Sequence, residues 1–241
     1  IVDRVSSGLD IPHKKGVGYA RKIGADIACQ LHDWGFILSD WCCFTDADVT
    51  LPADYFKRFC GISSQTAGLV FPHSHKPEGD RLQQQAIRCY QYKLNHHVAG
   101  LFRAGSPYAW HSIGSTICCR FEIYKQVRGM PARAAGEDFY FLNKLAKVGQ
   151  VESLSGDPVV SSGRSSLRVP FGTGPSIAKA LQPLAPPIRH YHPLSYDLLA
   201  ILLNRAVPAL WENRANPCEV FEQISGQFSA RLEGSGLARR T

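Results

Sequence analysis

Short apolar runs alternate along this chain with longer segments whose apolar residues recur every three or four positions, and this alternation restricts the fold most. Three runs are typical of buried strands: residues 41–44 (WCCF), 67–72 (AGLVFP) and 115–121 (STICCRF). Three segments show helical periodicity: residues 18–34, 80–103 and 137–148. We therefore predict an α/β sandwich of three layers with a mainly parallel sheet, in which ligands bind at the carboxyl ends of the strands.

The length of 241 residues allows one main core with a modest extension. A helix is predicted just after Thr50 and another around residues 196–211, whereas the chain beyond Asn213 has a loosely ordered composition. Residues 161–175 (SSGRSSLRVPFGTGP) have the composition of a long loop. We expect an α/β domain over residues 1–180 and a helical extension with a partly disordered tail over residues 181–241.

The charge and hydropathy patterns exclude several classes of protein. No stretch approaches the roughly 20 uncharged apolar residues that a membrane-spanning helix needs, so we expect no span, although peripheral association with a membrane stays open. The net charge of +7 comes from scattered basic residues rather than a stripe, and we expect no nucleic-acid partner. A small substrate that carries phosphate explains the positive charge equally well.

The eight cysteines include two adjacent pairs, Cys42-Cys43 and Cys118-Cys119, and form no CxxC motif. Neighbouring residues on a strand point to opposite faces of the sheet, so neither pair is suited to holding one metal ion. We expect reduced, buried thiols and hence a cytoplasmic protein.

Two aspartates, Asp46 and Asp48, directly follow the apolar run at residues 41–44. On an extended chain they project to the same side, and two carboxylates so close repel each other unless a cation lies beside them. Oxygen ligands of this kind suit Mg²⁺ or Mn²⁺, which binds through one or two carboxylates together with substrate phosphates. The alternative is that one aspartate caps the following helix and the other is solvated.

Three segments carry a resemblance to a known family: GVGYARKIGAD (residues 16–26), FTDADVTLPADYF (44–56) and GEDFYFLNKLAKVG (136–149). Their order and spacing are similar to those of family 2 glycosyltransferases with the GT-A fold, and the resemblance covers residues 1–155. It implies a metal-dependent transfer of a sugar from a nucleotide-diphosphate donor to an acceptor hydroxyl. In that interpretation Asp48 and Asp46 hold the metal, with Asp46 toward the ribose.

The acidic pair Glu137-Asp138 matches the family's acceptor-side motif. Asp138 inherits the position of the general base in inverting members, and Glu137 is expected to orient the loop or to bind acceptor hydroxyls. The alternative is helix capping, because acids favour a helix N-terminus whatever the function.

Further residues are assigned to the nucleotide-sugar donor. Asp3 resembles an acid that contacts the nucleotide base, and Arg21 and Lys22 match a basic position near the donor phosphates, unless they form an exposed helix face. Arg164 and Arg168 lie in the predicted loop at residues 161–175, which either closes over the diphosphate or is a surface strap.

Aromatic residues and histidines supply the remaining candidates. Tyr108, Trp110 and His111 are predicted to form a wall of the sugar or acceptor site, with the alternative that Trp110 anchors its loop in the core. Either of two histidine pairs could add a metal ligand: His73 with His75, or His190 with His192.

The chain departs from the family at its start, since no strand with a proline- and asparagine-bearing turn precedes Ile1, and we expect the first strand of the fold to be missing. Two other functions stay open. A nucleotidyltransferase acting on sugar phosphates would normally carry a phosphate loop rich in glycine and lysine near its start. A degenerate, non-catalytic sugar-binding module is disfavoured by the four intact acids, Asp46, Asp48, Glu137 and Asp138.

Overall fold

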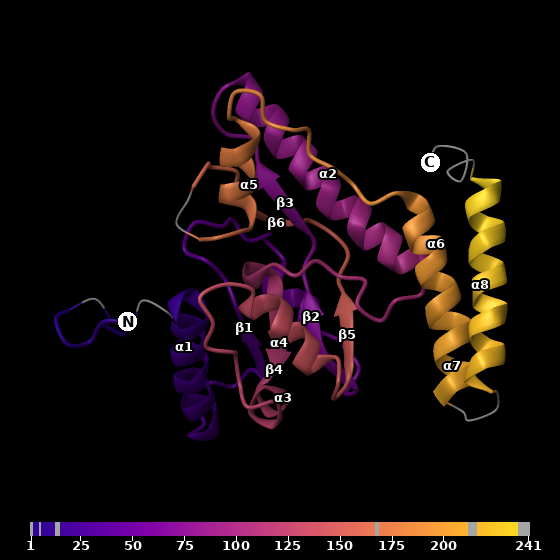
Figure 1. The fold of residues 1–241 in the computed structure, drawn as a ribbon. Helices are drawn as coiled ribbons and strands as arrows, with labels where there is room; N and C mark the ends of the chain where they lie inside the picture. The colour runs from indigo at the N-terminus through magenta and orange to yellow at the C-terminus, as the bar shows by residue number, and fades with distance from the viewer. Residues whose placement is uncertain (1, 5, 13–14, 167–168, 212–215, 236–241) are drawn as a thin grey trace. The chain divides into compact units, whose positions relative to one another are not determined.

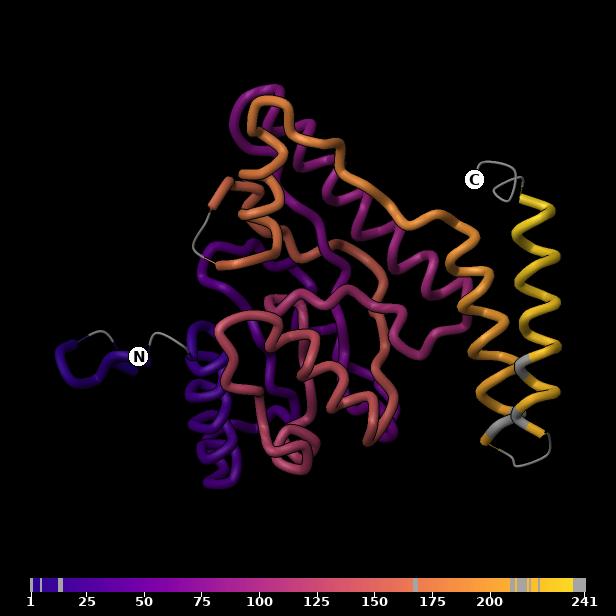
Figure 2. The backbone as a smooth tube through the Cα atoms, in the orientation of Figure 1, coloured from indigo at the N-terminus to yellow at the C-terminus, as the bar shows by residue number. Residues whose placement is uncertain are grey.

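The structure, a computed structural model, describes residues 2–4, 6–12, 15–166, 169–211 and 216–235 (Figures 1 and 2). They form two compact units. The first consists of Ile1–Gln91 and Trp110–Pro187, and the second of Tyr92–Ala109 and Ile188–Thr241. The first unit thus ends near the predicted boundary at residue 180, but residues 92–109 belong with the C-terminal helices.

The first unit is built on a mixed sheet with the strand order β1-β4-β2-β5. Its strands are β1 (Trp41–Cys43), β4 (Ile117–Arg120), β2 (Thr66–Val70) and β5 (Gln150–Ser153). β4 is antiparallel to both of its neighbours, and only the pair β2 and β5 is parallel. The expectation of a mainly parallel sheet is corrected to this extent, because an apolar run indicates a buried strand but not its direction. A second sheet pairs β3 (His73–Lys76) with β6 (Val159–Ser162) in parallel.

Alternating side chains of the main sheet enter two hydrophobic clusters. On one face Cys42, Ile117 and Cys119 join a core shared with α1 (Gly16–Asp33), α3 (Phe121–Gln126) and α4 (Glu137–Leu145), which all cover this face (Figure 1). On the other face Trp41 and Cys118 pack with residues of the short 3₁₀ helix η1 (Tyr55–Phe59). The sheet therefore buries both faces, as an α/β sandwich requires.

The adjacent cysteines do point to opposite faces, which confirms that prediction. All eight cysteines are free thiols, although Cys60, Cys89 and Cys218 are exposed rather than buried. Burial raises the pKa of Cys29 to about 11 and that of Cys42 to about 12, so these two thiols are inert.

The first unit also contains the N-terminal part of α2 (Arg81–Arg103), the 3₁₀ turn η2 (Gly114–Thr116) and α5 (Thr173–Ala180). Most of the segment predicted as a loop at residues 161–175 is irregular, but its ends lie in β6 and α5. Arg168 lies outside the described residues.

The second unit is helical. It combines the C-terminal part of α2 with α6 (Pro193–Ile201), the π-helical turn η3 (Leu202–Ala206), α7 (Val207–Trp211) and α8 (Pro217–Gly234). Its core contains Ala206, Val220 and Ile224. The prediction of a helix around residues 196–211 is confirmed. Residues 217–234, for which loose order was predicted, instead form α8, because Val220, Ile224 and Phe228 recur at four-residue steps and pack on η3.

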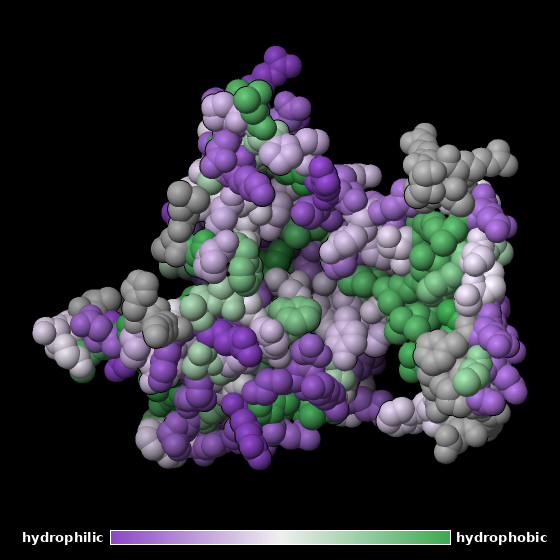
Figure 3. Space-filling model, viewed as in Figure 1, coloured by the Kyte–Doolittle hydropathy of each residue, from purple (hydrophilic) through white to green (hydrophobic). Residues whose placement is uncertain are grey.

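Apolar side chains also gather on the visible surface of this helical unit (Figure 3). The exposed apolar residues of the unit include Leu202, Val207 and Trp211. Within the described part of the chain, no helix is both long and apolar enough to cross a membrane.

Candidate active site

Arg21 joins the two acidic motifs of the chain. From α1 its Nη2 lies 2.5 Å from Oδ1 of Asp46, and its Nη1 donates a hydrogen bond to Oε1 of Glu137. The side chains of Arg21 and Glu137 are only 11% and 4% exposed, whereas that of Asp46 is 42% exposed. A guanidinium binds two acids at once because its N–H donors form a rigid planar fork. Residues from segments far apart in the sequence thus meet at one cation.

Glycines allow this close approach. The backbone N–H of Gly18 donates to the carbonyl oxygen of Arg133 at 3.1 Å, and a Cβ on Gly18 would lie 2.6 Å from that oxygen. The start of α1 therefore packs directly on the segment that leads into α4. At Gly114 a Cβ would overlap the guanidinium of Arg21. The small residues of both segments are needed to place Arg21 between the acids.

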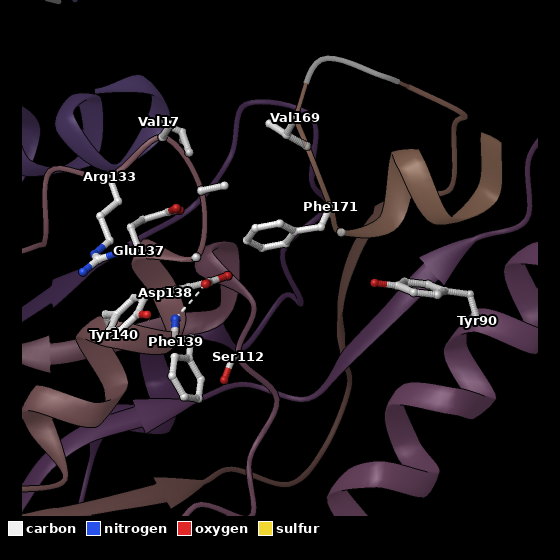
Figure 4. A pocket seen from close by; sticks show the side chains of 14 residues that line it. Val17, Tyr90, Ser112, Arg133, Glu137, Asp138, Phe139, Tyr140, Val169 and Phe171 are labelled. Atoms are coloured by element: carbon white, nitrogen blue, oxygen red, sulfur yellow. Dashed lines mark hydrogen bonds between the residues drawn. The ribbon is translucent and has the colours of Figure 1, made fainter. Parts of the chain in front are cut away.

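Asp138 follows Glu137 in the first turn of α4 and borders a cavity of about 660 Å³ (Figure 4). Its Oδ1 accepts a hydrogen bond from the backbone N–H of Phe139 at 2.7 Å. Burial raises the pKa of Asp138 to about 6, and the negative charge of Glu137 adds to this shift, while the Phe139 N–H and Arg21 oppose it. The N-cap of α4 is Gly136, and no side chain caps this helix, so the contact with Phe139 is a local hydrogen bond within its first turn.

Four aromatic side chains border the same cavity: Tyr90, Phe139, Tyr140 and Phe171. The ring of Phe171 packs against Gly136 at the start of α4, and Tyr90 comes from α2 (Figure 4). Arg133 lines the cavity too, with its Cζ 3.8 Å from the centroid of the Tyr140 ring. The site combines aromatic surfaces with two acids and one cation.

Asp48 does not join the network around Arg21. Its Oδ2 lies 2.8 Å from Nη2 of Arg164, and both side chains are about half exposed. Asp46 and Asp48 each use one carboxylate oxygen for an arginine, which leaves a second oxygen outside the ion pair. Two half-exposed carboxylates with a spare oxygen each fit Mg²⁺ or Mn²⁺, because such ions commonly take one or two protein carboxylates and complete their shell with phosphates and water.

Other predicted donor residues are placed elsewhere. Lys22 pairs with Asp26 on α1 at 2.8 Å. Asp3 lies in an exposed turn near the N-terminus and accepts hydrogen bonds from the backbone and hydroxyl of Ser6. Neither residue lines the cavity beside Asp138.

The predicted aromatic wall is not the one that the structure shows. Trp110 is buried in the main core, as its alternative interpretation predicts. Tyr108 belongs to the second unit, and the ring of His111 lies 6.5 Å from that of His73. Ser112, which follows His111 in the sequence, does line the cavity, whereas these three residues do not.

The paired histidines have structural partners. His73 and His75 are buried and meet edge to face, with ring centroids 4.4 Å apart. His75 uses both ring nitrogens, for Gln91 at 2.6 Å and Thr173 at 2.8 Å, while burial lowers the pKa of His73 to about 3. In the second unit Nδ1 of His192 caps α6, and His190 packs against Tyr92.

One group among the described residues has the geometry of a metal site, namely His32, Asp33 and Glu122. Nζ of Lys125 lies 2.9 Å from Asp33 and 2.6 Å from Glu122, and it holds the pKa of Asp33 below its usual value. Unlike the arginines at Asp46 and Asp48, this one lysine bridges both acids of the group and lies where a metal ion would bind them, so the group is a surface ion-pair network.

Sequence reasoning missed Arg133 and the four aromatic residues of the cavity. One signal was present, since residues 138–142 (DFYFL) place more aromatic side chains in the first turns of α4 than one buried face can hold. Phe139 and Tyr140 are indeed 51% and 43% exposed. Exposed aromatic residues beside a cavity indicate a binding surface.

Comparisons with known proteins found no match, whether to a protein-family model, a curated protein or a solved structure. The structure itself shows a mixed α/β fold with a mixed sheet.

Proposed function

We propose that this chain is a metal-dependent glycosyltransferase of the GT-A type, which moves a sugar from a nucleotide-diphosphate donor to an acceptor hydroxyl with inversion. The observation that carries the proposal is Arg21, which ties Asp46 of the FTDADV segment to Glu137 of the GED segment beside the cavity at Asp138. The motifs that carry the family resemblance therefore meet in space around one charge network.

The donor end of this site is the pair Asp46 and Asp48. Mg²⁺ or Mn²⁺ held there would neutralise the charge that develops on the departing diphosphate. Arg21 keeps Asp46 in a fixed position by pairing with it, and Glu137 fixes Arg21 in turn from a buried position.

Asp138 is the base at the acceptor end. As the acceptor oxygen bonds to the anomeric carbon and the bond from that carbon to the diphosphate breaks, the hydroxyl proton passes to the carboxylate of Asp138. A pKa of about 6 suits this step, since at neutral pH the group is mostly ionised yet remains basic enough to take a proton. The Phe139 N–H holds Oδ1 and leaves Oδ2 for the proton.

The test is a product analysis with a panel of nucleotide-diphosphate sugars, Mn²⁺ and mixed glycoside acceptors. A glycosylated acceptor and free nucleoside diphosphate in equal amounts are expected. In a parallel assay with a nucleoside triphosphate and a sugar 1-phosphate, released pyrophosphate would instead show a nucleotidyltransferase. Sugar binding without any release in either assay would show a non-catalytic binding module. Asp138→Asn and the surface change Lys147→Gln serve as the active-site variant and its control.

A further inference from the structure

The cavity beside Asp138 has a positive end that the transfer mechanism does not use. Arg133 is exposed and lines the cavity, and its guanidinium stacks on the ring of Tyr140. Across the described ranges, Arg133 forms no ion pair with an acid, whereas Arg21 and Arg164 both do. Arg133 is thus a cation held in position without an anion.

Stacking on Tyr140 prepares Arg133 to bind an anion. The contact uses the flat face of the guanidinium, so its N–H groups, which lie in the plane, still point outward. A fixed planar guanidinium binds carboxylate or phosphate through two parallel hydrogen bonds, and little side-chain entropy remains to be lost.

The anion belongs to the acceptor rather than to the donor. The residues that line the cavity include Asp138, which must contact the acceptor hydroxyl, but neither Asp46 nor Asp48. The rings of Tyr90 and Phe171 offer flat surfaces of the kind that pack against the C–H face of a sugar, and a cavity of about 660 Å³ has room for a small saccharide.

We propose that the acceptor is a saccharide that carries a carboxylate or phosphate group, bound with its reactive hydroxyl at Asp138 and its anionic group at Arg133. This inference rests on the proposed function for the role of Asp138, but binding of the anionic sugar can be measured without any transfer.

The experiment compares three probes with the purified protein: methyl β-glucoside, methyl β-glucuronoside and glucose 6-phosphate. Calorimetry is expected to show that one or both anionic sugars bind about 10–100-fold more tightly than the neutral glucoside, the range of a charge-assisted hydrogen-bonded pair. The stronger of the two anions identifies the group that the site prefers. Arg133→Gln should bring the affinity ratio close to one, and Arg133→Lys should keep part of it, since lysine has the charge without the fork.

Lys147→Gln is the matched control, because it removes the same charge just beyond the other end of α4 and should leave the ratio unchanged. Equal binding of all three probes by the unaltered protein overturns the inference, as does a preference that persists in Arg133→Gln. Should Arg133→Gln not fold, the ratio of the affinities for the anionic and neutral sugars is compared between the unaltered protein and Arg133→Lys, and this comparison decides.

Transfer assays with the same sugars separate this inference from the proposed function. Transfer that shows no preference for anionic acceptors overturns the inference and supports the function. If binding shows a preference for anionic sugars that depends on Arg133, but no donor gives transfer, the inference is supported and the proposed function is overturned. A change in donor KM alone on Arg133→Gln would assign Arg133 to the donor diphosphate and overturn the acceptor assignment.

Discussion

Replacing Arg21 with methionine should destabilise the first unit, because it leaves the buried carboxylate of Glu137 without a partner. Glu137 would lose its cation while its side chain stays only 4% exposed, and breaking a buried ion pair in this way typically costs about 3–5 kcal/mol. The pair with Asp46 adds little, because that carboxylate is 42% exposed and can be solvated by water. We expect a loss of about 3 kcal/mol, which corresponds to a fall in Tm of about 6–12 °C for a domain of this size.

The assay is urea unfolding followed by tryptophan fluorescence, since Trp41 and Trp110 are buried in the first unit. Lys22→Met is the control, because it removes an exposed ion pair between neighbouring turns of α1 and should cost less than about 0.5 kcal/mol. Changing Glu137 to methionine as well should restore most of the stability, since the buried carboxylate is then gone. The reasoning is refuted if Arg21→Met costs no more than Lys22→Met, or if the double variant is no more stable than Arg21→Met.

Four further predictions concern the site. The transfer rate should rise with pH through about 6 and then level off. Asp138→Asn should lower this rate by about 10²–10⁴-fold at neutral pH while the affinity for the donor is kept. Near-normal turnover of the variant would leave Asp138 only a structural role in the first turn of α4. Because burial raises the pKa of Asp138, its ionisation opposes folding, and the stability that the protonated group contributes below pH 3.8 is lost as pH rises through about 6. In a thermal melt at pH 7–8, Asp138→Asn should therefore be more stable than the unaltered protein. An equal Tm of the two proteins at pH 8 would contradict the raised pKa. Gly114→Ala should displace the guanidinium of Arg21 and so reproduce much of the destabilisation of Arg21→Met in urea, whereas an unchanged midpoint would show that Arg21 can bind both acids from another position. A chelator should abolish binding of the nucleoside diphosphate, and Asp48→Ala should remove the dependence on metal together with most of the affinity; calorimetry with equal affinity in both conditions would exclude a metal at this pair.

The sequence predicted the strands that are apolar throughout, and it missed those that are not. β1, β2 and β4 were found because both faces of the sheet are buried and their residues form continuous apolar runs. β3 (HSHK) and β5 (QVES) are mostly polar and β6 (VVSS) is half polar, so none of them forms a continuous apolar run, and their pairing with a neighbouring strand is not encoded in a local pattern.

The four acids were found by motif, but their partners were not. A motif gives residue types along the chain, whereas the bond from Arg21 to Glu137 depends on how α1 packs against the segment before α4. Arg21 was expected at the donor phosphates and instead lies between two carboxylates. The aromatic walls of the cavity come from α2, α4 and the segment at residues 169–172, and no local pattern links these three places.

The separation of buried charges from exposed aromatic walls has a consequence for how this site can diverge. Exchanging Phe139, Tyr140 or Phe171 changes the surface that a substrate meets, yet these side chains are 51%, 43% and 59% exposed and contribute little to the core. Arg21, Glu137 and the glycines around them tolerate no such exchange, because each fills a position defined by its neighbours. Under the proposed function, acceptor preference can therefore change by single substitutions while the charge arrangement stays constant, and a design that redirects the acceptor should randomise the aromatic walls and leave the charge network intact.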